Sequence, residues 1–210
     1  MKDIIIIGAG GFGREVKQLI SDINRDNPSF NLLGFVDDGI IKGTMIHDLP
    51  VLGNTDYLKS LEESTSLAVA IGHPGTKKSI VKELGKFDFP SLIHPTVHPL
   101  GTNIRIGEGC ILCRHTILTC DITLGDFVIL NLACTVGHDA VIKSYSSFMP
   151  AVNISGEVTI EECVYVGTGA KIINSLDIGE NATIGAGAVV NKSIPANTVA
   201  VGIPAKPLNK

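Results

Sequence analysis

Residues 130–159 read LNLACT VGHDAV IKSYSS FMPAVN ISGEVT, five blocks of six residues that each begin with an apolar side chain. The same spacing holds over sixteen consecutive positions from Leu100 to Val190, and none of these positions is polar. The residue four places further on is again small or apolar, as at Cys134 and Val152. Neither the 3.6-residue period of a helix nor the 2-residue period of a strand would keep this spacing. It indicates a repeat architecture, an all-β parallel β-helix of hexapeptide repeats.

Three blocks are expected to form one coil, with each block supplying a short strand and a turn. The six-spaced residues then point inward, so that successive coils stack into one apolar column. The stack should be about 25 Å long, since neighbouring strands lie about 4.8 Å apart. Glycine follows the inward residue in several blocks, as at Gly137 and Gly167, and we interpret it as a turn residue with unusual backbone angles.

The start of the chain has a different pattern. Residues 3–7 form an apolar run typical of a buried parallel strand. A glycine-rich turn at residues 8–13 follows at once, and an amphipathic helical stretch runs from residue 14 to about residue 23. A strand, a glycine-rich turn and a helix in this order can bind phosphate through backbone N–H groups at the helix N-terminus. A purely structural role for the turn stays open.

A second predicted strand, residues 32–36, ends in Asp37 and Asp38, where such folds often hold a ribose. The region before the repeats is long enough for one mononucleotide-binding half but not for two, which disfavours a nicotinamide dehydrogenase. We therefore predict a Rossmann-like α/β half domain over residues 1–90. Residues 91–210 are predicted to form the β-helix domain with a C-terminal tail.

Composition narrows the function further. A net charge of −4 offers no general basic surface for nucleic acid. The apolar run near the N-terminus is too short for a membrane span and no signal-peptide cleavage pattern follows it, so we predict a cytoplasmic protein. Five cysteines, an odd number, do not suggest a disulfide framework. Cys110 and Cys113 form a CxxC near His115, but a structural zinc usually takes two such pairs, so no metal is predicted.

Four segments together carry a family resemblance: GAGGFGREV at 8–16, GFVDD at 34–38, NLACTVGHDAVI at 131–142 and VGIPAKP at 201–207. The chain resembles the left-handed hexapeptide acyltransferases, specifically the bacterial NeuD-like and PglD-like sugar acetyltransferases. This resemblance implies a left-handed β-helix, acetyl-CoA as co-substrate, and a homotrimer with active sites between subunits. It also implies direct acetyl transfer onto a nucleotide-linked amino sugar, as in the synthesis of surface polysaccharides.

The same resemblance assigns roles to individual residues. It implies that His138 is the general base and that Asp139 supports its imidazole, and a neutral histidine suits proton acceptance near pH 7. Gly156 is expected to donate its backbone N–H to the thioester carbonyl. The other donor-binding positions it implies are Asn131, Ser147, Gly167, Thr168, Gly185, Ala186 and Lys206. The acceptor-binding positions expected in the first domain are Gly10, Gly11, Phe12, Gly13, Asp37, Asp38, Gly53 and His73.

Two positions depart from the family pattern, and two other functions stay open. Phe12 stands where a histidine is common, so the acceptor is not identified. Ser147 replaces a second histidine and could form hydrogen bonds but carry no charge. The alternatives are O-acetylation of a sugar or sialic acid by the same machinery, and a non-catalytic trimeric scaffold that binds a nucleotide sugar. We interpret His94 and His98 as structural residues at the junction between the domains, and His115 as a turn residue.

Overall fold

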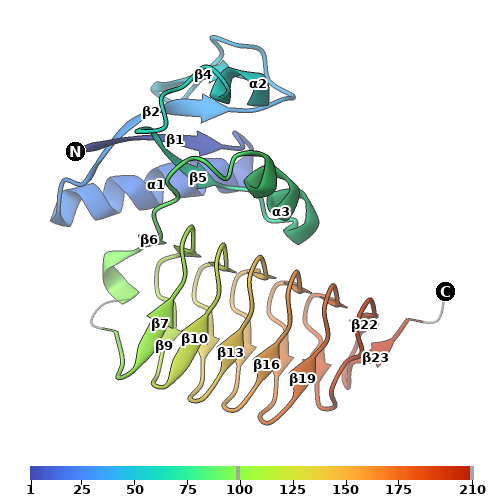
Figure 1. The fold of residues 1–210 in the computed structure, drawn as a ribbon. Coiled ribbons are helices and arrows are strands. Elements are labelled where there is room, and N and C mark those ends of the chain that lie inside the picture. Colours follow the sequence, from blue (N-terminus) through green and yellow to red (C-terminus); the bar gives the residue numbers. More distant parts are fainter. Residues whose placement is uncertain (98–99, 209–210) are drawn as a thin grey trace.

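The computed structural model describes residues 1–97 and 100–208, and it places an α/β region across one side of a long β-helix (Figure 1). The α/β region has a five-stranded sheet of order β3-β4-β2-β1-β5. Strand β1 pairs in parallel with β2 and β5, and the central strand β2 also pairs in parallel with β4. The strands are β1 (Lys2–Ile7), β2 (Phe30–Val36), β3 (Met45–Ile46), β4 (Leu49–Gly53) and β5 (Ser66–Val69), and the helices are α1 (Gly11–Asp26), α2 (Thr55–Leu58) and α3 (Pro74–Glu83).

The β-helix has three parallel sheets, one on each face of its coils. The face under the α/β region, here the covered face, contains β6 (Leu92–Ile93), β8 (Ile111–Leu112), β11 (Ile129–Leu130), β14 (Ser147–Phe148), β17 (Tyr165–Val166), β20 (Thr183–Ile184) and β22 (Val199–Val201). The second face contains β9 (Ile117–Leu118), β12 (Thr135–Val136), β15 (Asn153–Ile154), β18 (Lys171–Ile172) and β21 (Val189–Val190). The third face contains β7 (Ile104–Ile106), β10 (Ile122–Leu124), β13 (Val141–Ile142), β16 (Thr159–Ile160) and β19 (Asp177–Ile178).

The coils form a left-handed β-helix. Their strand register confirms the hexapeptide repeat. Thr123 pairs with Val141, and Val141 in turn with Thr159, so each coil advances by 18 residues. The six-spaced side chains point into one continuous core, where Val136 is 1% exposed and Phe148 is fully buried. Burial of such side chains stabilises the fold by about 1.5–3 kcal/mol each, and here they form one column through every coil.

The corners of the coils correct our interpretation of the glycines. The left-handed backbone conformation falls three residues after the inward position, as at His115 (φ 62°) and Asp139 (φ 58°), and not at the glycines one residue after it. Gly137 has no positive φ; a Cβ atom there would lie 2.6 Å from the backbone nitrogen of Gly156 in the next coil. These glycines are therefore required by the close approach of neighbouring coils, and His115 occupies a turn as predicted.

The α/β region packs on the outer side of the covered face. The outward side chains of Ile111 and Ile129 are 1% exposed there and join one apolar cluster with α1, whereas Ile117 on the second face is 57% exposed. The chain crosses between the two parts at β6 and a short 3₁₀ helix, Pro95–Val97. His98, which we assigned to this junction, lies outside the described residues.

The last coil ends in a reversal of the chain. Strand β22 pairs in parallel with β20, and β23 (Lys206–Pro207) then returns antiparallel to β22. Lys206 is exposed at this end of the covered face. Within residues 1–97 and 100–208, none of the helices has the length and apolar character needed to cross a membrane.

Candidate active site

His138 lies at the corner between the second and third faces, after β12 and before β13. Its Nδ1 atom is 2.8 Å from Oδ2 of Asp139, and the two side chains are 59% and 58% exposed. Asp139 has the left-handed backbone conformation that aspartate tolerates better than most residues. A hydrogen bond from Nδ1–H to this carboxylate leaves Nε2 as the proton acceptor, a tautomer assigned from the geometry. The pair thus has the arrangement of a general base and its supporting carboxylate.

Gly156 lies one coil further on, directly against the imidazole. The N–H of Glu157 donates to the carbonyl of His138 at 2.8 Å, which holds the two coils together at this corner. A Cβ atom on Gly156 would lie 2.5 Å from Nε2 of His138, so the ring occupies the space that a side chain would take. The N–H of Gly156 makes no hydrogen bond to any other described residue. The expected role of this N–H as a donor to the thioester carbonyl stays a prediction.

Five of the predicted donor-binding positions gather at a different corner, between the covered and second faces. Gly167 and Thr168 follow β17, and Gly185 and Ala186 follow β20 one coil later. Asn131 follows β11 at the same corner; it is 5% exposed, and its Oδ1 accepts the N–H of Leu132 at 2.6 Å. Strand β12 separates Asn131 from His138. One chain therefore does not bring the base and these positions together.

The glycine-rich turn is open to solvent at the start of α1. Gly10 precedes the helix, which has no side-chain cap, and a Cβ atom on Gly10 would meet nothing within 4 Å. Gly13, in contrast, lies so close to the carbonyl of Gly8 that a Cβ atom would be only 1.9 Å from it. Gly13 therefore serves helix-to-strand packing, while Gly10 and Gly11 leave backbone N–H groups exposed at a helix N-terminus. Phe12 is partly buried against the apolar cluster around α1.

The other predicted acceptor residues lie at the same edge of the sheet, because its parallel strands end there. The Asp37 carboxylate accepts the N–H groups of Ala9 and Gly39, both at 2.8 Å, and so fixes the glycine-rich turn. Asp38 accepts the N–H and the hydroxyl of Thr55 at 2.8 and 3.0 Å, and thereby joins β2 to α2.

Gly53 and His73 complete this edge. Gly53 is the last residue of β4 and lies against the side chain of Tyr57. His73 is the N-cap of α3, and its Nδ1 accepts the N–H of Thr76 at 3.2 Å. The predicted acceptor positions therefore follow the carboxyl ends of β1, β2, β4 and β5, while His73 also lines a pocket against the covered face with Tyr165 and Thr183.

Ser147 requires a correction. We assigned it to the donor groove, but it lies in β14 on the covered face and is fully buried beneath α3. Its hydroxyl accepts a hydrogen bond from Nζ of Lys77 at 2.9 Å. A side chain enclosed in this way does not line the groove at either corner. Sequence reasoning missed Lys77 because the two residues are 70 positions apart and meet only when the α/β region docks.

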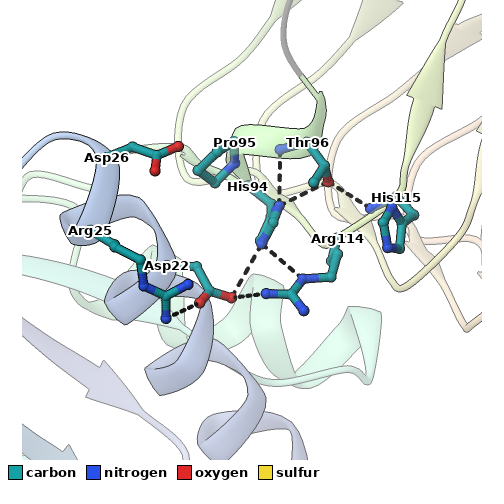
Figure 2. Close-up of a pocket in the computed structure, with 8 residues that line it drawn as sticks. All are labelled: Asp22, Arg25, Asp26, His94, Pro95, Thr96, Arg114 and His115. Atoms are coloured by element: carbon teal, nitrogen blue, oxygen red, sulfur yellow. Dashed lines mark hydrogen bonds and ion pairs between the residues drawn. The ribbon is translucent and has the colours of Figure 1, made fainter.

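A second polar cluster, also missed, lies where α1 meets the first coil (Figure 2). Asp22 there accepts from Nη2 of Arg114 at 2.7 Å and is 3.2 Å from Nε2 of His94. Burial alone would raise the pKa of Asp22, but hydrogen bonds from Gln18 and His94 and the Arg114 charge lower it. Burial lowers the pKa of His94, and the Arg114 charge adds to this effect, while Asp22 opposes it. A cavity of about 300 Å³ lies beside the cluster, whose place at the domain junction agrees with our interpretation of His94.

The CxxC cysteines are buried thiols. Burial raises the pKa of Cys110 to about 11 and that of Cys113 to about 12, so both stay protonated near neutral pH. Among the residues that the structure describes, no three histidine, cysteine, aspartate or glutamate side chains are grouped so that they could hold a metal ion.

Comparison with known proteins finds similarity along the whole chain. Residues 3–84 match the family model described as the PglD N-terminal domain. GDP-perosamine N-acetyltransferase from Escherichia coli O157:H7 is 30% identical over 98% of this chain and 96% of its own length. The acetyltransferase domain of PglB from Neisseria gonorrhoeae FA1090, solved with acetyl coenzyme A, is 31% identical with a TM-score of 0.89 and covers 99% of both chains. PerB from Caulobacter crescentus, solved with CoA and GDP-perosamine, is 27% identical with a TM-score of 0.90 and covers 100% of this chain and 98% of its own.

Proposed function

Because the chain belongs to the PglD-like family of hexapeptide-repeat sugar acetyltransferases, we propose that it transfers the acetyl group of acetyl-CoA to the amino group of a nucleotide-linked amino sugar. The observation that carries this proposal is the His138–Asp139 pair set against Gly156 at an exposed corner. Two of the relatives named above are described as acetyltransferases, one of them as a GDP-perosamine N-acetyltransferase. The third, PerB, was solved with CoA and GDP-perosamine.

In this proposal the chain's own residues take the following roles. Nε2 of His138 accepts a proton from the acceptor amine as its nitrogen attacks the thioester carbonyl. The negative charge on the carbonyl oxygen is stabilised by the N–H of Gly156. The C–S bond then breaks, and the imidazolium returns the proton to the departing thiolate of CoA. Asp139 holds the ring through Nδ1 and stabilises the imidazolium between these steps.

The donor requires a second copy of the chain in this proposal. We propose that the arm of acetyl-CoA runs along Gly167, Thr168, Gly185 and Ala186, with Lys206 near its phosphates. These positions and His138 lie at different corners of one β-helix, separated by the second face. A homotrimer in which the His138 corner of one copy faces this donor corner of the next would bring them together. It would have three active sites between subunits.

The acceptor is proposed to bind to an α/β domain that comprises residues 1–90, at the carboxyl edge of its sheet. Its phosphates would meet the open N–H groups at Gly10 and Gly11, where the helix dipole favours negative charge. Phe12 can stack on an acceptor but cannot exchange hydrogen bonds with it. A GDP-linked 4-amino sugar is the first candidate, given the names of the relatives. We propose that the reaction takes place in the cytoplasm.

The test is release of free CoA thiol from acetyl-CoA with UDP-, dTDP- and GDP-linked 4-amino sugars, each beside its hydroxyl counterpart. Turnover with one amine that disappears in His138→Ala supports the proposal. A matched control is His115→Asn, because this histidine is also exposed at a corner and asparagine tolerates its backbone conformation. Activity on hydroxyl sugars alone would move the assignment to O-acetylation. Binding of nucleotide sugars without turnover would favour the scaffold function.

A further inference from the structure

Lys77 is a buried amine that the proposed mechanism does not use. It lies on α3 between the α/β region and the β-helix, and its side chain is 1% exposed. Its Nζ atom donates to the hydroxyl of Ser147, which is itself fully buried on the covered face. Among the described residues no carboxylate forms an ion pair with Lys77. Its neighbour Lys78, in contrast, is partly exposed and pairs with Glu162 at 2.8 Å.

Burial of the Lys77 amine lowers the stability of the fold, so packing by itself does not explain this residue. Burial lowers the pKa of Lys77 to about 7, and the nearby thiols of Cys110 and Cys163 oppose this shift. An apolar side chain of the same length would fill the space without this penalty, and replacement of buried charged groups by apolar ones is often neutral or stabilising. The buried hydrogen bond instead fixes one orientation of α3 on the β-helix, because a shift of either partner leaves a buried polar group unpaired.

The segment that this hydrogen bond fixes is the start of α3. It belongs to the carboxyl edge of the α/β sheet, here called the acceptor edge, which contains Gly10, Gly11, Asp37, Asp38, Gly53 and His73. The N–H of Lys77 donates to the carbonyl of His73 at 3.0 Å, so the lysine anchors the first turn of α3. The preceding Gly72 lies near Met149: a Cβ atom added to this glycine would be 3.8 Å from Cε of the methionine. Met149 is two residues beyond Ser147 and reaches the donor corner, one coil after Asn131. The hydrogen bond from Lys77 to Ser147 therefore sets how the acceptor edge sits over the donor corner.

We propose that Lys77 is a positioning residue which, through Ser147, holds the acceptor edge at the height that presents the amino sugar to the donor corner. This inference rests on the proposed function and adds to it a residue outside the reacting groups. It predicts a selective effect: the acceptor should bind less well when the hydrogen bond is removed, while the donor, which meets only the β-helix, should bind as before.

The experiment compares Lys77→Met with Lys78→Met. For Lys77→Met we expect the KM for the amino sugar to rise about tenfold, as expected for the loss of one buried hydrogen bond to a charged group, with the KM for acetyl-CoA within about twofold of the wild type. Lys78→Met removes an ion pair that also links α3 to the β-helix, through Glu162. Because this pair is partly exposed and such pairs contribute little, both KM values should stay within about twofold of the wild type. If Lys77→Met does not fold, Ser147→Ala removes the same hydrogen bond with a smaller change in volume and should show the same selective rise.

Two results would overturn the inference. One is an unchanged KM for the acceptor. The other is a rise in both KM values together with a fall in kcat and Tm, which would indicate a merely structural role. Hydrogen exchange supplies a readout that does not need turnover. Amides of residues 72–77 should exchange faster in Lys77→Met than in Lys78→Met, while the core of the β-helix stays protected. Wild-type protein that is silent on every acceptor would count against the proposed function; unchanged exchange at residues 72–77 would count against the role of Lys77.

Discussion

Gly156→Ala is the perturbation that separates catalysis from folding most sharply. The added Cβ atom would lie 2.5 Å from Nε2 and 2.6 Å from Cε1 of His138, so the imidazole must move away from its present position. The ring is 59% exposed and can rotate into solvent. Displacing the general base by 1 Å or more should lower kcat by about 10²-fold or more.

The cost in stability should be small. Gly156 has no positive φ, so alanine fits its backbone. Rotation of the ring would break the exposed hydrogen bond between His138 and Asp139, an interaction of a kind worth about 0–1 kcal/mol. For a chain of this length that corresponds to a fall in Tm of about 4 °C or less. The assay is CoA release with the identified acceptor, beside thermal unfolding followed by circular dichroism.

Gly137→Ala is the matched control. Its Cβ atom would meet the backbone of the next coil, 2.6 Å from the nitrogen of Gly156 and 2.7 Å from the carbonyl carbon of Ser155. Neither can rotate away, so we expect a loss of about 3 kcal/mol and a fall in Tm of roughly 6–12 °C. Wild-type kcat in Gly156→Ala, or unfolding of that variant as severe as for Gly137→Ala, would refute the placement of the imidazole on Gly156.

Three further predictions concern histidines and the carboxylate. His138→Ala should lower kcat by about 10³-fold or more while Tm stays within about 2 °C and CoA still binds by calorimetry; loss of the fold would contradict its place at an outer corner. Asp139→Asn should keep the fold, because asparagine tolerates φ 58°, and lower kcat about tenfold in the CoA-release assay; an unchanged kcat would exclude a supporting role for the carboxylate. The pKa of His94 is lowered in the folded protein, so as the pH falls the unfolded chain binds this proton first. The free energy of unfolding, measured with urea, should therefore decrease as the pH drops below about 6.5. In His94→Gln this decrease should be smaller, and an equal pH dependence in both proteins would contradict the prediction.

The sequence was sufficient to predict the apolar column inside the β-helix and the residues that lie at the acceptor edge. Six-residue spacing identifies inward side chains such as Phe148 without any knowledge of contacts, because the repeat makes every coil alike. The acceptor edge was predictable since parallel strands place their carboxyl ends together, which gathers Gly10, Asp37 and Gly53. Spacing could not give the reason for Gly137, however, because the distance between coils decides it.

Contacts between the two parts of the chain were beyond the sequence. Lys77 and Ser147, like Asp22 and Arg114, carry no local pattern that links them, and each pair forms only when α1 and α3 dock on the covered face. The carboxylate of Asp37 illustrates the same limit within the α/β region. Its position at the end of a strand was clear, but the hydrogen bond that it accepts from the N–H of Ala9 depends on how the glycine-rich turn closes over it.

The central claim is acetyl transfer from acetyl-CoA to a nucleotide-linked amino sugar with His138 as the base. The most direct measurement is CoA release by the wild type and His138→Ala on GDP-linked 4-amino sugar, beside the hydroxyl analogue. The account predicts turnover of the amine by the wild type, none above background with the hydroxyl, and loss of turnover in the variant. Equal turnover by both proteins would contradict it.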